Sequence, residues 1–155
     1  MIRGIVAIDN KRGMSREEGL PWHLPQEGQH FAREIAHAPV LMGYGTYLEV
    51  QQPFHGGPDY VATRNTEPLR PGFVAVSDAV DFLEHFEGDI WNLGGPGLLK
   101  ATLDMIDELH LTQVEADYHC TKFLPEYRDK FHLVSESEPQ IENGVTYRYQ
   151  VWQHN

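Results

Sequence analysis

The stretch from Gly19 to Phe31, GLPWHLPQEGQHF, places one carboxylate at the edge of an apolar pattern. Two prolines four residues apart bar a regular helix between them, and a helix is predicted from about Gln26 to about His37. Glu27 then lies in the first turn, where the helix dipole favours a negative charge. Two interpretations remain open: an ordinary exposed acid, or a carboxylate that lines a pocket.

A second candidate site is the turn Gly94-Gly95-Pro96-Gly97, which follows a predicted strand and precedes a predicted helix. Glycines at such a turn let the backbone approach a ligand, and the N–H groups of the helix start can face an anion such as a pyrophosphate. The motif is not the G-x-G-x-x-G fingerprint of the classical dinucleotide fold. A tight turn without a ligand is the alternative.

Length and composition predict one soluble domain over residues 1–155, with 41% hydrophobic and 23% charged residues. The single cysteine, Cys120, excludes an intrachain disulfide framework. The first apolar run is too short for a signal sequence, and no uncharged run approaches the ~18 residues of a membrane span, so we expect a cytoplasmic protein without a membrane partner. The net charge of −11 argues against nucleic acid as a partner.

Strands and helices alternate along most of the chain. Strands are predicted at residues 2–8, 39–43, 59–63, 73–76, 89–93 and 108–114. Further helices are predicted at residues 46–50, 78–86 and 98–103, the second with Ser77 as its N-cap. Residues 14–19 are expected to form a mobile loop. The tail, 131–152, reads as two strands around the turn dipeptide Asn143-Gly144. This order predicts an α/β domain with a central, mainly parallel twisted sheet, an antiparallel C-terminal hairpin and about four flanking helices.

The segment LPWHLP, with Glu27 and Phe31 after it, resembles the folate-binding signature of dihydrofolate reductases. The double glycine resembles the turn that packs against the cofactor in that family. The segments LHLTQVEA, from residue 109, and CTKFLP, from residue 120, are similar to its later strand and the loop after it. The resemblance covers residues 5–152, and it implies a monomer with the fold predicted above.

The resemblance implies NADPH-dependent reduction of 7,8-dihydrofolate to tetrahydrofolate, with hydride transfer to C6 of the pterin and a proton to N5. Glu27 is implied as the pocket carboxylate that bonds the pterin, with a pKa raised by its apolar surroundings. Thr112 would bond that carboxylate or the pterin, Trp22 would hold an ordered water, and Leu20 would lie on a loop that closes over the nicotinamide. These four are the expected catalytic residues.

The other positions carried over from the family fall into two sets, whose members would otherwise be ordinary core, strand or turn residues. The expected substrate-binding residues are Ile5, Val6, Ala7, Glu27, Phe31, Val50, Phe54, Leu93 and Thr112. The expected cofactor-binding residues are Ala7, Met14, Leu20, Gly43, Tyr44, Gly45, Thr46, Thr63, Arg64, Leu93, Gly94, Gly95, Gly97, Leu98 and Thr121. No metal site is expected, because the histidine spacing at 23, 30 and 37 is too wide for one ion.

The sequence departs from the family where the cofactor phosphate should bind. Tyr44 stands where family members usually carry a basic residue that meets the 2′-phosphate of NADPH. Arg64 leaves the next strand nearby, and a guanidinium suits a phosphate, so we expect Arg64 to bind the 2′-phosphate alone. NADPH remains the expected cofactor.

A larger departure affects the glutamate tail of the substrate. The family's tail-binding arginine would fall at about Gly57, and no Lys or Arg occurs in residues 34–63. Arg33 or His55 are the available substitutes. Gly28, where the family usually has a bulky apolar residue, would widen the slot beside Glu27.

These departures leave three alternatives open. The chain could reduce another pterin without a glutamate tail, or the ribosylated pyrimidine of riboflavin synthesis. It could also bind a pterin or nucleotide without turnover. Oxidation of NADPH separates the enzymes from the binding protein.

Overall fold

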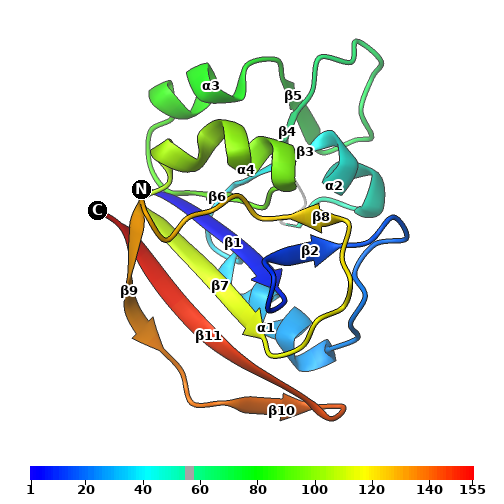
Figure 1. The fold of residues 1–155 in the computed structure, drawn as a ribbon. Coiled ribbons are helices and arrows are strands. Elements are labelled where there is room, and N and C mark those ends of the chain that lie inside the picture. The colour runs from blue at the N-terminus through cyan, green and yellow to red at the C-terminus, as the bar shows by residue number, and fades with distance from the viewer. Residues whose placement is uncertain (55–57) are drawn as a thin grey trace.

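The computed structural model describes residues 1–54 and 58–155 (Figure 1). Within this part of the chain, nine strands form one sheet in the order β10-β11-β7-β1-β6-β3-β4-β5, and β9 also pairs with β11. The strands are β1 (Ile2–Ile8), β3 (Val40–Gly43), β4 (Asp59–Ala62), β5 (Phe73–Val76), β6 (Ile90–Asn92), β7 (Glu108–Val114), β9 (Phe131–Glu136), β10 (Gln140–Glu142) and β11 (Val145–His154). A second, two-stranded sheet joins β2 (Gly13–Ser15) to β8 (Lys122–Phe123).

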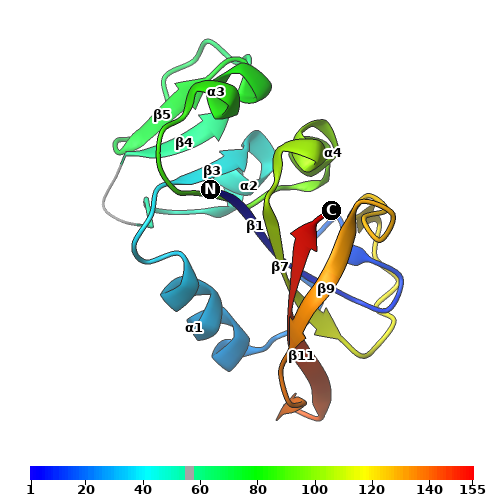
Figure 2. The same cartoon turned by 90° about the vertical axis from the view of Figure 1, so that its left-hand side faces the viewer.

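Helices cover both faces of the large sheet. They are α1 (Pro25–Glu34), α2 (Tyr44–Glu49), α3 (Ala79–His85) and α4 (Pro96–Thr102), the last continued by a 3-10 turn, η1 (Leu103–Met105). Figure 2 shows α1 on one side of β1 and β7, and α4 on the other. No helix in residues 1–54 or 58–155 is long and apolar enough to span a membrane.

Alternation along the strands explains the two-sided core. Ile5 and Trp91 join the cluster beneath α1 and α2, whereas Val6 and Ile90, their neighbours in sequence, face α3 and α4. Strands buried on both faces read as continuous apolar runs, as in Val40–Met42, which is fully buried. The pairs of β1 with β6 and β7 are parallel, and β11 runs antiparallel to β7. The predicted fold class is therefore confirmed.

Several predicted boundaries are wrong for local reasons. The first helix ends at Glu34 rather than His37, because the chain must turn before Pro39 to enter β3. The N-cap of α3 is Asp78 rather than Ser77, since the Asp78 carboxylate accepts a 3.0 Å hydrogen bond from Asp81 N.

Pairing with distant segments accounts for the other differences. The C-terminal tail forms three strands rather than two, because β9 adds to β11 beside the predicted hairpin of β10 and β11. Part of the predicted loop 14–19 is strand β2, which pairs with β8 more than a hundred residues later. The second helix begins at Tyr44, two residues earlier than predicted.

Candidate active site

A cavity of about 450 Å³ lies where β1, β3 and β6 end, between α1, α2 and the start of α4. Ligands of open α/β sheets bind at these carboxyl ends of parallel strands. Fifteen of the predicted site residues line it, and four further residues join them. The lining consists of Ile5, Val6, Ala7, Met14, Ser15, Leu20, Glu27, Phe31, Gly43, Tyr44, Gly45, Thr46, Glu49, Leu93, Gly95, Pro96, Gly97, Leu98 and Lys122.

Glu27 is the carboxylate at the α1 wall of this cavity. Thr112 Oγ1, on β7, donates a 2.9 Å hydrogen bond to Glu27 Oε1 across 85 positions of sequence. Burial raises the pKa of Glu27, the Thr112 hydrogen bond opposes that rise, and the charge of Glu142 adds to it. Glu27 therefore holds a proton more readily than an exposed glutamate.

The C-terminal hairpin fixes the start of α1 and so the position of Glu27. Leu24 occupies the N-cap position, and its side chain makes no capping hydrogen bond. Instead, Gln26 N donates to both carboxylate oxygens of Glu142, on β10, at 2.9 and 3.2 Å. Asn143 Nδ2 also donates to the carbonyl oxygen of His23 at 3.0 Å. A carboxylate from another element thus caps the helix in place of its own N-cap residue.

Glycine backbone forms the opposite wall. Gly43 N donates a 2.7 Å hydrogen bond to Gly94 O, and Gly94 N donates a 3.0 Å bond to Asn92 Oδ1. Gly94 has a φ of +78°, which favours glycine, and a cis peptide joins it to Gly95. A Cβ added at Gly95 would meet only Thr46 Oγ1, at 3.9 Å, and one at Gly97 would meet nothing within 4 Å. The wall is therefore open to close approach by a large ligand.

Eight predicted site residues lie outside the cavity lining: Trp22, Val50, Phe54, Thr63, Arg64, Gly94, Thr112 and Thr121. Thr112 and Gly94 support the lining from behind, through the hydrogen bonds above. Trp22 is buried edge-on against Tyr118, and its indole N–H has no hydrogen-bond partner among the described residues. Thr121 N donates to Ser15 O at 2.9 Å, beside the cavity.

The substrate-slot and phosphate residues lie farther out. Phe54 is 39% exposed and meets the edge of Phe31, with ring centroids 5.9 Å apart. Val50 packs partly buried at the end of α2. Arg64 is exposed after β4. His55 and Gly57, expected near the substrate tail, lie outside the described residues.

Thr63 and its neighbours link the turn after β4 to α2. Asn65 N donates to Thr63 Oγ1 at 3.0 Å, and Asn65 Nδ2 donates to the Tyr44 hydroxyl at 3.3 Å. Tyr44, the position at which the resemblance led us to expect a basic residue, is thus linked to the turn that carries Arg64.

The four unpredicted lining residues are Ser15, Glu49, Pro96 and Lys122. Glu49 lies three residues after Thr46 in α2, so helical spacing from a predicted site residue could have identified it. Ser15 and Lys122 are partners in the β2–β8 ladder, which no local pattern in the sequence signals.

Arg70 is a further residue that the sequence did not single out. Its guanidinium donates to the carbonyl oxygen of Tyr47 at 2.7 Å and to that of Val50. It also lies 4.0 Å from the centre of the Tyr47 ring. Arg70 therefore clamps the C-terminal end of α2, whose other end forms part of the cavity.

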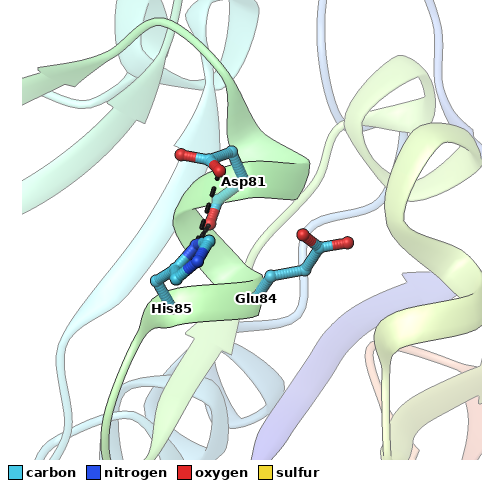
Figure 3. A group of neighbouring side chains, drawn as sticks. All are labelled: Asp81, Glu84 and His85. Atoms are coloured by element: carbon cyan, nitrogen blue, oxygen red, sulfur yellow. Dashed lines mark hydrogen bonds and ion pairs between the residues drawn. The ribbon is translucent and has the colours of Figure 1, made fainter.

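A separate cluster of possible metal ligands lies on α3, away from this cavity. The ligand atoms of Asp81, Glu84 and His85 lie within 4.8 Å of one another, and all three residues are exposed (Figure 3). Hydrogen bonding to the Asp81 carbonyl oxygen, and then the Asp81 carboxylate, raise the pKa of His85. This i, i+4 pair is an ordinary helix-stabilising contact.

Comparison with known proteins agrees with these features. A model of the dihydrofolate reductase family matches residues 1–154. The dihydrofolate reductase of Staphylococcus aureus (strain Mu50) is 27% identical over 143 residues, covering 92% of this chain and 89% of its own. That of Bacillus subtilis (strain 168) is 25% identical over 153 residues, covering 97% and 91%.

A solved structure gives the same fold. Dihydrofolate reductase from Enterococcus faecalis, complexed with NADP(H) and RAB-propyl, superposes with a TM-score of 0.87 at 22% identity, covering all of this chain and 96% of its own. The chain therefore belongs to the dihydrofolate reductase family, the NADPH-dependent oxidoreductases that reduce dihydrofolate.

Proposed function

We propose that this chain reduces 7,8-dihydrofolate to tetrahydrofolate with NADPH, as a monomeric, single-domain cytoplasmic enzyme in which Glu27 binds and helps to protonate the pterin. The observation that carries the proposal is the Glu27–Thr112 pair at the wall of the 450 Å³ cavity. A carboxylate there can accept hydrogen bonds from the amino group and a ring nitrogen of a pterin. Its raised pKa suits a group that shares a proton with the substrate.

The glycine wall fits a dinucleotide cofactor. NADPH supplies the hydride when it is bound. Gly43, Gly95 and Gly97 leave the backbone exposed to it, and Thr46 offers a hydroxyl for a phosphate from the same wall. Arg64, exposed after β4, is the group that we assign to the 2′-phosphate.

Weak recognition of the glutamate tail is part of the proposal. Among the described residues that line the cavity, Lys122 is the only Lys or Arg, and Glu49 adds a negative charge. The guanidinium of Arg70 lies near this region, but it already donates hydrogen bonds to the Tyr47 and Val50 carbonyl oxygens at the end of α2. We therefore expect the tail to add little affinity.

The scarcity of basic side chains in the cavity lining favours a second candidate function, the reduction of a pterin without a glutamate tail. This reaction would need Glu27 and the cavity, but it would not need a cation beyond α2 to bind a tail carboxylate. Reduction of the ribosylated pyrimidine of riboflavin synthesis fits less well, since its phosphate would need more basic residues than the cavity lining contains.

The test compares NADPH oxidation by the wild type and by Glu27→Gln with dihydrofolate as substrate. The substitution keeps the size of the side chain and removes its proton chemistry, so kcat/KM should fall about a hundredfold or more. Glu84→Gln makes the same change on the exposed face of α3 and should leave kcat/KM unchanged. Wild-type activity in Glu27→Gln would refute the assignment.

A further inference from the structure

A second cavity, of about 330 Å³, lies behind Glu27, between α1 and the face of β7, β11 and β9. Its polar lining includes His30 from α1, His110 and Thr112 from β7, Ser135 from β9 and Tyr149 from β11. Glu34, Glu136, Ser137 and Gln150 complete the polar lining. Ile5, Leu111 and Val151 add apolar surface to this lining. Liquid water occupies about 30 Å³ per molecule, so a cavity of this size has room for several waters beside its polar side chains.

Strand register explains why these side chains converge. Thr112 is paired with Ala7 of β1 and with Tyr149 of β11, while His110, two residues earlier on the same face, is paired with Val151. His30 closes the helix side, because its ring stacks on that of Tyr149 with centroids 3.8 Å apart and planes 22° apart.

The two cavities meet at the Glu27–Thr112 hydrogen bond. Glu27 lines the first cavity and Thr112 lines the second, and 2.9 Å separates Thr112 Oγ1 from Glu27 Oε1. A hydroxyl that donates to a carboxylate still has lone pairs free to accept from water. Thr112 therefore connects the carboxylate of one cavity with the interior of the other.

We propose that the second cavity is the passage through which solvent protons reach Glu27, by way of the Thr112 hydroxyl. The inference rests on the function proposed above. A pterin bound at Glu27 would cover the side of the carboxylate that faces the first cavity. The Thr112 side, toward the second cavity, is then the side left open to water.

The proton balance of this route is simple. A hydronium ion in the passage gives a proton to Thr112 Oγ1 and becomes water, while that hydroxyl gives its own proton to Glu27 Oε1. The carboxyl group then passes a proton to the pterin, whose N5 gains one N–H bond as C6 gains one C–H bond from the hydride. One solvent proton enters for each hydride transferred, and Thr112 and Glu27 return to their starting states.

Other titratable groups surround the pair. Glu142 of β10 and Tyr149 of β11 face Glu27, and His30 lies one turn farther along its helix. His30 in turn faces Glu34 and Arg33 of α1 and His110 of β7. His110 Nε2 is also 3.1 Å from Glu108 Oε1.

A reversible block of the passage tests the proposal on folded protein. Ser135 lines the passage and is exposed, so Ser135→Cys can be labelled with a benzyl methanethiosulfonate and released with dithiothreitol. The native Cys120 is buried, and burial raises the pKa of its thiol to about 11, so it should not react. Val134→Cys, on the same strand, 56% exposed and outside the lining, is the matched control.

The readouts are single-turnover NADPH oxidation with dihydrofolate across pH and its solvent deuterium isotope effect. Labelled Ser135→Cys should be slower by about tenfold or more above the pH at which Glu27 is protonated, with a larger isotope effect, unchanged dissociation constants and full recovery in dithiothreitol. Labelled Val134→Cys should match the wild type. A labelled Ser135→Cys with the wild-type rate and isotope effect at every pH would overturn the passage. A wild type that does not oxidise NADPH would instead overturn the proposed function.

Discussion

Thr112→Val is the most informative single change, because it removes the side-chain hydrogen bond that the described residues give to Glu27. Valine keeps the branched shape of threonine and loses its donor. Thr112 is only 5% exposed, so the substitution leaves Glu27 Oε1 without its side-chain donor at a buried position.

The magnitude follows from the hydrogen bond. A bond to a charged group contributes about 1.5–3 kcal/mol, and 1.36 kcal/mol corresponds to one pKa unit. The bond favours the charged form and opposes the rise caused by burial, so its loss should raise the pKa of Glu27 further. Because Glu27 is only partly buried, we expect the lower end of this energy range, which corresponds to a change of about one unit in the pKa of Glu27.

The assay is the pH dependence of kcat/KM. The limb on which activity falls with rising pH should move up by about one unit in Thr112→Val and stay in place in Thr112→Ser, which keeps the donor. The position of the limb is the readout, whatever the height of the plateau. An unmoved limb in Thr112→Val would refute the assignment of Glu27 as the titrating group.

Stability gives the same test without substrate. A folded-state pKa above the ordinary 4.5 means that Glu27 contributes stability below about pH 4.5, which is lost as pH rises through the folded pKa. Thr112→Val should extend that loss to higher pH in thermal unfolding, and Thr112→Ser should not.

Three further substitutions test other parts of the structure. Arg64→Ala should weaken NADPH binding about tenfold or more and leave NADH binding unchanged; an equal loss for both cofactors would contradict its contact with the 2′-phosphate. Arg70→Met should lower the free energy of unfolding by about 1–3 kcal/mol, since the Tyr47 and Val50 carbonyls lose their donor. A fall in kcat/KM for dihydrofolate but not for a tail-less dihydropterin would instead assign Arg70 to the glutamate tail. Gly28→Ala should stabilise α1 by about 1 kcal/mol in denaturant unfolding, because an added Cβ meets nothing within 4 Å, and a destabilised protein would show a hidden clash.

Local pattern predicted the parallel sheet well. Apolar runs such as Val40–Met42 and the alternation of Glu108–Val114 identify strands without any tertiary information. The family motif predicted that Glu27 and the glycine turn belong to one binding site, and both line the same cavity. Each could be located in the sequence because Glu27 lies in the first turn of a helix and the glycines lie between a strand and a helix.

Contacts between distant segments could not be read from the sequence. Glu142 caps α1 from 116 positions away, and the β2–β8 ladder brings Lys122 to the cavity across more than a hundred residues. Neither residue carries a local signal for its partner. The cavity behind Glu27 is likewise a product of strand register, because a slip of one residue would turn Thr112 and Tyr149 to the opposite face.

The most direct test of the account is NADPH oxidation by the purified protein with dihydrofolate and, at matched concentrations, with a tail-less dihydropterin. We expect turnover of both at similar kcat/KM, because Glu27 and the cavity recognise the pterin, whereas Lys122 is the only Lys or Arg among the described residues that line the cavity and the end of α2 occupies Arg70. Strong preference for dihydrofolate would contradict the account of the tail. No oxidation with either substrate, while NADPH still binds, would contradict the assignment of a pterin to Glu27.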